Sequence, residues 1–394
     1  MPAILVYYSQ GPNDRILGTL FAEQSRGREI YSFEFAPEAI RLGYASTLSD
    51  PELSPVLGRQ YKSDPSEPFH FMSDASPDRW GRRLLKRAAN GKTLLESDFL
   101  LGVSDASRMG ALRFKTEPNG PFLSEGDEVP PYRFLRELEQ AAFDFDEYSD
   151  DPRWQALLAP GSSLGGARPK ASIHGPDGSL YLAKFSSQND REDLPQLEYL
   201  TYLLAIEAGI EMMPSAWIPY QNGRSVFLTK RFDRDEQGGR VHCASFMTLL
   251  GAQDGDSGSY TYLDLAQTLS VQSIRPEMDL RQLFRRIAFS LLLHNYDDHL
   301  RNHAMIRRNE GWVLSPAFDL NISLDRGGLT IPVCAEGSTL DILCDSATFF
   351  ALKKDEAKRI VEVMRETLRQ ALPRLGKKAS APTRLLDAVA KMLG

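Results

Sequence analysis

Asp297 and Asn302 have the residue types and the spacing to transfer a phosphoryl group. They lie five positions apart in the polar segment 293–302, which follows a long apolar stretch. In a kinase catalytic loop an aspartate accepts the proton of the attacking hydroxyl, and an asparagine five positions later holds Mg²⁺. Asp319, in segment 315–320, could hold the same ion from a strand end, because magnesium needs few protein oxygens when substrate phosphates supply the rest. An Asp-x4-Asn pair arises by chance in most chains of this length, so the interpretation depends on residues upstream.

A glycine-rich segment, residues 161–170, precedes two short apolar runs that are separated by Gly175-Pro176-Asp177-Gly178. This turn predicts a hairpin, because proline sets φ and glycine accepts a positive φ. On the second strand Leu180, Leu182 and Lys184 share one face, since side chains alternate along a strand. A lysine on an apolar face either reaches water from an edge strand or has a partner. The order of glycine loop, strand, turn and lysine strand favours the second interpretation, because it matches the phosphate-holding half of a protein kinase.

Glu198 lies near the start of a helix predicted over residues 197–208, which Gly209 ends at its C-terminal cap. A helical glutamate is usually a solvated residue. With Lys184 in front of it and the Asp/Asn/Asp set behind it, Glu198 is predicted to orient that lysine.

A candidate hinge, residues 225–234, follows the Asn222-Gly223 dipeptide, which is a strong hairpin signal. Backbone groups between Thr229 and Phe232 could bind an adenine edge. The alternative is an ordinary core strand that ends in a charged turn.

These stretches resemble the HipA-type toxin kinases of bacterial toxin–antitoxin pairs. Residues 163–170 resemble the family's phosphate loop, residues 230–234 its Arg-Phe-Asp-Arg hinge signature, residues 297–302 its Asp-x-His-x-x-Asn loop, and residues 315–319 its metal-binding strand end. Segments 33–38, 73–78 and 110–112 resemble the family's N-terminal companion domain. The resemblance therefore covers nearly the whole chain.

The resemblance implies ATP- and Mg²⁺-dependent phosphorylation of a protein serine or threonine. The substrates of family members include translation components such as aminoacyl-tRNA synthetases. By motif match, Lys184 would hold the phosphates, Asp297 would be the catalytic base, and Asn302 and Asp319 would hold magnesium. The residues expected at the ATP site are Ser163, Gly165, Gly166, Ala167, Lys184, Glu198, Lys230, Arg231, Phe232, His299, Asn302 and Asp319. Ser163, or alternatively Ser162, would be an autophosphorylation site.

Two other classes of function stay open. A small-molecule phosphotransferase of kinase-like fold would use the same base and metal residues. A non-catalytic component of a repressor complex would keep the ATP-site residues for structure, but the presence of the whole set argues against it.

Three positions depart from ordinary protein kinases. The chain has no Gly-x-Gly-x-x-Gly loop, and Leu320-Asn321 stands where Phe-Gly would follow the metal aspartate. His299 follows Asp297 instead of preceding it, and we interpret it as orienting the loop backbone, with a buried structural histidine as the alternative. Asp298 is the alternative base, although the spacing to Asn302 favours Asp297.

The expected architecture is α+β, with a protein-kinase-like two-lobed fold and an N-terminal α+β companion domain. Pro- and Gly-rich segments near residues 117–121 and 129–131 mark a boundary. We therefore predict a companion domain over 1–120, a strand-rich ATP lobe over 132–245 and a helical catalytic lobe over 246–394.

Composition is typical of a globular cytoplasmic enzyme. The 394 residues are 42% hydrophobic and 25% charged. No apolar run reaches the roughly 18 residues of a membrane span, and the start lacks signal-peptide features. The three cysteines show no Cys-x-x-Cys spacing, which argues against a zinc site.

Charge limits direct binding to nucleic acid. The net charge is −7, and residues 353–394 carry an excess of six basic side chains over acidic ones. An acidic body binds DNA weakly, because neutralisation of phosphates drives non-specific affinity. The family resemblance implies a small helix-turn-helix antitoxin as partner, and operator DNA is expected only through that partner.

Overall fold

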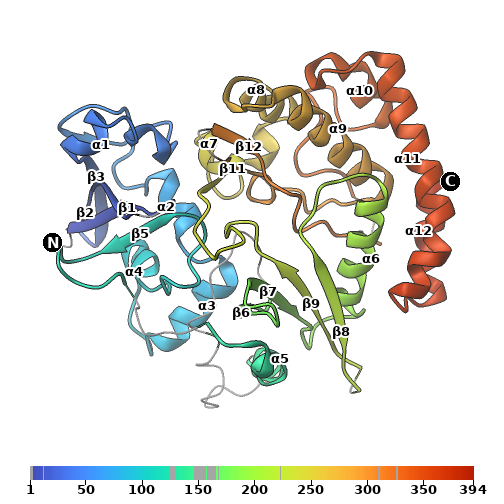
Figure 1. Ribbon diagram of the computed structural model, residues 1–394, viewed down its shortest axis with the longest axis horizontal. Helices are drawn as coiled ribbons and strands as arrows, with labels where there is room; N and C mark the ends of the chain where they lie inside the picture. Colours follow the sequence, from blue (N-terminus) through green and yellow to red (C-terminus); the bar gives the residue numbers. More distant parts are fainter. Residues whose placement is uncertain are drawn as a thin grey trace. The chain divides into compact units, whose positions relative to one another are not determined.

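The computed structural model describes residues 3–11, 13–123, 129–145, 157, 166, 168–221, 223–308, 311–324 and 327–394. The chain packs into two compact units. The first comprises Met1–Ser187 and Arg231–Gln253, and the second comprises Gln188–Lys230 and Asp254–Gly394. The three-domain division expected from the sequence stays a prediction. Figure 1 follows the chain from blue to red and labels its elements.

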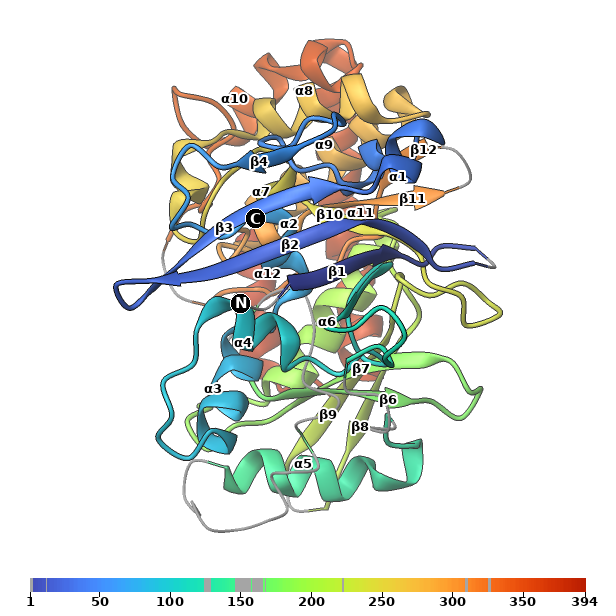
Figure 2. The same cartoon turned by 90° about the vertical axis from the view of Figure 1, so that its left-hand side faces the viewer.

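The first unit contains a five-stranded antiparallel sheet in the order β4-β3-β2-β1-β5. Figure 2 shows β3, β2 and β1 side by side. Apolar side chains on alternate positions of the strands face a core that includes Phe33, Phe69 and Phe71. The two-residue turn between β2 and β3, Arg26-Gly27, has positive φ at both positions, which suits the twist of a tight hairpin. The strands are β1 (Ala3–Tyr8), β2 (Arg15–Ser25), β3 (Arg28–Phe35), β4 (Arg59–Tyr61) and β5 (Leu112–Lys115).

Short helices complete this unit. The α3 helix begins after Asp78 because the Asp78 side chain accepts a hydrogen bond from the Gly81 N–H at 2.9 Å, as an N-cap does. Its buried face includes Trp80 and Leu84. The described helical elements of the unit are α1 (Pro37–Arg41), η1 (Ala45–Leu48), α2 (His70–Ala75), α3 (Arg79–Ala88), α4 (Glu96–Leu101), η2 (Tyr132–Phe134), α5 (Leu135–Asp144) and α7 (Phe246–Leu249), which follows strand β10 (Cys243–Ser245).

The predicted lysine hairpin is present in the first unit. Strands β6 (Lys170–His174) and β7 (Leu180–Phe185) pair antiparallel, and Lys170 stands opposite Lys184. The turn contains Gly178 at φ 78°, which a residue with a Cβ atom rarely adopts.

The second unit begins with α6 (Leu194–Glu207) and the hairpin of β8 (Ser215–Pro219) and β9 (Ser225–Lys230). The α6 helix starts three residues before the expected position because Asp193 caps it by accepting the Gln196 N–H at 3.1 Å. It ends before Gly209, whose φ is 74°, as the sequence predicts.

Helices form most of the rest of this unit. The apolar stripe predicted around residues 283–292 lies on α9 (Pro276–Leu293), where all of its members except the half-buried Leu291 are buried. Figure 1 shows α11 and α12 next to each other, and they pack together. The further elements are η4 (Asp256–Ser259), α8 (Tyr262–Gln272), η5 (Leu300–Asn302), β11 (Ala304–Arg308), β12 (Gly311–Leu314), α10 (Leu340–Asp345), η6 (Ala347–Phe350), α11 (Lys354–Lys378) and α12 (Thr383–Leu393). None of the helices in the described part of the chain is both long and apolar enough to cross a bilayer.

Candidate active site

The end of α9 delivers the candidate catalytic loop. His294 closes the helix in the left-handed conformation, with φ 55°. Asn295 then fixes the start of the loop from both sides. Its amide nitrogen donates to the Ser290 hydroxyl at 3.1 Å, and its side-chain oxygen accepts the Asn321 N–H at 3.0 Å. Asn295 therefore connects the loop to the segment that follows β12. This role was not predicted from the sequence, although an asparagine just past a helix end could have suggested it.

Asp297, His299 and Asn302 are brought together by this loop. The Asp297 side chain is 76% exposed, and His299 Nε2 lies 3.9 Å from its Oδ1. The Asn302 side-chain nitrogen donates to the Asp297 carbonyl at 2.7 Å. The His299 side chain is 29% exposed, so His299 is not a fully buried structural histidine. The hydrogen bond from Asn302 holds the backbone of Asp297, and the exposed carboxylate of Asp297 can contact the hydroxyl of a substrate.

Asp298 occupies the opposite environment. It is 1% exposed and accepts hydrogen bonds from the Tyr262 hydroxyl and the Thr330 N–H, both at 2.7 Å. The Tyr262 hydroxyl also lies 3.1 Å from His303 Nε2. Burial raises the pKa of Asp298 to about 7, and the two hydrogen bonds oppose that rise. Both oxygens of Asp298 are thus engaged inside the unit, which favours Asp297 over Asp298 as the base.

Replacing Asp298 by asparagine should flatten the pH dependence of stability. The pKa of Asp298 is about 7 when folded against an ordinary 3.8, so between these values the native state holds a proton that the unfolded state lacks. Its contribution to the free energy of unfolding is therefore present at low pH and lost as the pH rises through 7. From pH 5 to pH 8 the wild type should lose roughly 2–3 kcal/mol that Asp298→Asn does not lose.

Urea unfolding at several pH values measures this difference. Asp387→Asn, an exposed change on α12, is the matched control and should follow the wild type. Equal pH slopes for Asp298→Asn and the wild type would contradict the burial argument.

Asn302 and Asp319 could hold a magnesium ion. Because the Asn302 nitrogen is bound to Asp297, its Oδ1 points elsewhere, and this buried oxygen has no hydrogen-bond partner among the residues that the structure describes. A buried polar atom without a partner is costly unless a ligand satisfies it. Oxygen donors of this type suit Mg²⁺.

Hydrogen bonds connect the segment that contains Asp319 to the start of the candidate catalytic loop. It lies in the left-handed region at φ 56°, and its Oδ1 accepts the Asn321 side-chain N–H at 3.2 Å. Asn321 is in turn bonded to Asn295, and the Ser323 N–H donates to the His294 carbonyl at 3.1 Å. Non-glycine residues in such backbone conformations cluster at functional sites.

The expected nucleotide-holding residues are divided between the two units. Lys184 lies on β7 in the first unit and Glu198 on α6 in the second, and both are 8% exposed. The pairing of Lys184 with Glu198 stays a prediction. Gly166 has φ 96°, which suits a loop that only glycine tolerates. The expected sites Ser162, Ser163, Gly165 and Ala167 lie outside the described residues.

The candidate hinge has a structural task that the sequence did not indicate. The Lys230 N–H donates to the Pro214 carbonyl and the Arg231 N–H to the Leu180 carbonyl, each at 2.9 Å. The Arg231 side chain is buried and binds both carboxylate oxygens of Asp233 at 2.8 and 2.7 Å. A buried guanidinium needs such partners. Any role of Lys230, Arg231 and Phe232 in binding adenine therefore depends on the remaining backbone groups and stays a prediction.

A model of the HipA-like C-terminal domain matches residues 162–372, more than half of the chain. The chain belongs to the HipA-like C-terminal domain family. The expectation of a HipA-type chain is thereby confirmed.

Two curated relatives of this family member are Sinorhizobium fredii proteins. "Putative kinase Y4dM" is 27% identical over 281 residues, which cover 62% of this chain and 63% of that protein. "Putative kinase Y4mE" is 27% identical over 179 residues, which cover 40% of this chain and 41% of that protein. The chain thus spans less than two thirds of the length of these relatives.

A solved structure shares the fold. It is titled as the Shewanella oneidensis MR-1 toxin–antitoxin system HipA, HipB and its operator DNA complex. The match has a TM-score of 0.71 at 14% identity and covers 99% of this chain and 96% of that one. The α+β, protein-kinase-like two-lobed fold expected from the sequence is confirmed.

Proposed function

We propose that this HipA-family chain is an ATP- and Mg²⁺-dependent kinase that phosphorylates serine or threonine in a cytoplasmic protein. The observation that carries the proposal is the loop geometry. An exposed Asp297 carboxylate lies beside Asn302, whose buried side-chain oxygen has no hydrogen-bond partner in the described part of the chain. The relatives named as kinases support the same chemistry.

The residues divide the reaction between them. The substrate hydroxyl oxygen forms a bond to the γ-phosphorus, the bond from that phosphorus to the bridging oxygen breaks, and ADP leaves. Asp297 accepts the proton of the attacking hydroxyl. Asn302 and Asp319 would hold the magnesium ion, which would neutralise the charge on the phosphates. Lys184, oriented by Glu198, holds the phosphates from the β6–β7 hairpin.

The partners follow from the family. A small helix-turn-helix antitoxin is proposed, because the solved structure of like fold is a complex with HipB and operator DNA. DNA contact is proposed only through that partner, since this chain is net acidic at −7. Translation proteins such as aminoacyl-tRNA synthetases are the first substrates to test.

Incubation of the purified chain with γ-labelled ATP and Mg²⁺, with and without a cell lysate, tests the proposal. Label on a lysate protein is expected, and mass analysis then identifies the target. Label found only on small molecules would replace the proposal by a small-molecule phosphotransferase. Binding of ATP without any transfer would favour a non-catalytic repressor component.

Autophosphorylation is proposed at Ser163, with Ser162 as the alternative acceptor. Mass mapping of the segment 161–172 after incubation with ATP should find one added phosphate there. A Ser163→Ala variant should lose it if Ser163 is the acceptor and keep it if Ser162 is. An unmodified segment in the wild type would remove the proposal.

A further inference from the structure

Two residues at the start of helix α3 bind the first residue of strand β6. Asp78, the N-cap of α3, places its Oδ2 3.0 Å from the Lys170 ammonium. The Trp80 indole N–H donates to the Lys170 carbonyl at 2.9 Å. All three residues are at most 4% exposed. One helix end thus fixes both the backbone and the side chain of Lys170.

A second attachment holds the same strand two residues further on. The Arg231 guanidinium donates to the Ser172 hydroxyl at 2.9 Å and to the Ser107 carbonyl at 2.7 Å. Ser172 is fully buried and shares a face of β6 with Lys170, because side chains alternate along a strand. The strand is therefore fastened at two successive positions of one face.

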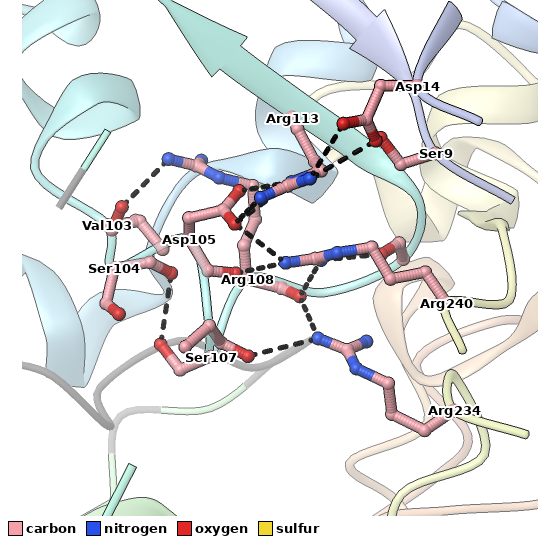
Figure 3. A network of polar contacts seen from close by, with 12 residues as sticks. Ser9, Asp14, Val103, Ser104, Asp105, Ser107, Arg108, Arg113, Arg234 and Arg240 are labelled. Atoms are coloured by element: carbon pink, nitrogen blue, oxygen red, sulfur yellow. Dashed lines mark hydrogen bonds and ion pairs between the residues drawn. The ribbon is translucent and has the colours of Figure 1, made fainter. Parts of the chain in front are cut away.

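The loop that supplies the Ser107 carbonyl is itself held by arginines (Figure 3). Arg234 donates to the Ala106 and Arg108 carbonyls at 3.1 Å, and Arg240 donates to the Arg108 and Gly110 carbonyls at 3.2 and 3.1 Å. These hydrogen bonds fix the backbone of the loop whose Ser107 carbonyl binds Arg231.

Both attachments act on the strand that pairs with Lys184. Lys170 stands directly opposite Lys184, and Ser172 opposite Leu182. Opposite residues of an antiparallel pair lie on the same face, where like charges destabilise each other. Asp78 offsets the charge of Lys170, so the two buried lysines can share this face.

We propose that Asp78 and Trp80 are positioning residues for Lys184. Through Lys170 they set the placement of the β6–β7 hairpin, which makes residues near the start of the chain part of the nucleotide-binding apparatus. The proposal rests on the proposed function, in which Lys184 holds the phosphates of ATP. A merely structural role for Asp78 and Trp80 would lower stability without changing the use of ATP.

Three variants of the full chain and one control variant separate these roles. Trp80→Phe removes the N–H and keeps an aromatic ring, whereas Asp78→Asn removes the negative charge that lies 3.0 Å from the Lys170 ammonium. Removing one partner of a buried ion pair costs far more stability than removing both. The double variant Asp78→Asn/Lys170→Met should therefore recover much of the stability that Asp78→Asn loses. Leu84→Ala, at a 1% exposed position of α3, is the control that destabilises the helix without touching Lys170.

Steady-state kinetics give the first measurement. Trp80→Phe and Asp78→Asn should raise the KM for ATP by about tenfold, with kcat within about threefold of the wild type, because ground-state phosphate binding is what they disturb. Leu84→Ala should lower the Tm and leave this KM unchanged. Hydrogen exchange of the nucleotide-free chain gives the second measurement, in which amides of 170–174 and 180–185 should exchange faster in the first two variants only.

The outcomes distinguish this proposal from the proposed function. A wild-type chain that binds no ATP overturns the proposed function and the role of Lys184 with it. A wild-type chain that binds ATP, together with an unchanged KM and unchanged exchange in Trp80→Phe and Asp78→Asn, overturns only the positioning proposal. A rise in KM that Leu84→Ala reproduces at equal loss of Tm also overturns it.

Discussion

The Asp297→Asn variant is expected to lose phosphoryl transfer by roughly 10²–10⁴-fold in kcat, the range that a positioned general base supplies. Asparagine has nearly the same shape as aspartate but cannot accept the substrate proton at neutral pH. The Asp297 side chain is 76% exposed, so the change should leave the fold intact. ATP binding should stay within about threefold of the wild type, because the carboxylate acts on the hydroxyl and not on the phosphates.

Rates of γ-phosphate transfer and calorimetric ATP binding check this expectation side by side. Asp341→Asn, at an exposed position of α10, is the matched control and should keep full activity. Full activity in Asp297→Asn combined with loss in Asp298→Asn would move the base to Asp298. Loss of ATP binding in Asp297→Asn would show that Asp297 belongs to the nucleotide site.

The second large effect is expected for Asp319→Asn. Asparagine keeps an oxygen donor but replaces the charged carboxylate, one of two proposed protein ligands of Mg²⁺, by a neutral amide. This should raise the magnesium concentration for half-maximal activity by at least about tenfold and lower kcat by roughly 10³-fold. Asparagine is the appropriate substitution because Asp319 lies at φ 56°, a conformation that asparagine tolerates. Alanine would add about 1–2 kcal/mol of backbone strain and confuse the result.

Titration of activity with MgCl₂ at saturating ATP measures this change. Thermal unfolding without nucleotide is the control, and the Tm of Asp319→Asn should stay near that of the wild type. An unchanged magnesium requirement would exclude Asp319 from the metal site, and the buried Asn302 oxygen would then need another ligand partner.

Elements governed by neighbours in sequence were predictable. The Gly175–Gly178 turn and the alternation after it predict β6 and β7, and the apolar stripe over 283–292 predicts α9. The five-residue spacing brings Asn302 to the Asp297 carbonyl because both lie in one short loop. Helix α6 begins three residues before its predicted start, because the cap at Asp193 outweighs the hydrophobic pattern on which the prediction relied.

The partners of buried charges depended on tertiary structure. No residue near Asp298 in the sequence indicates that Tyr262, 36 residues earlier, donates to it. This contact, the Thr330 N–H and burial together distinguish Asp298 from Asp297. Arg231 reaches Ser107 across 124 residues, and Trp80 reaches Lys170 across 90. Turns and helix caps are settled by local backbone geometry, which residue types report. A buried charge or polar atom is satisfied by whichever distant segment the fold brings within about 3 Å, and a single sequence carries no periodic signal for that choice.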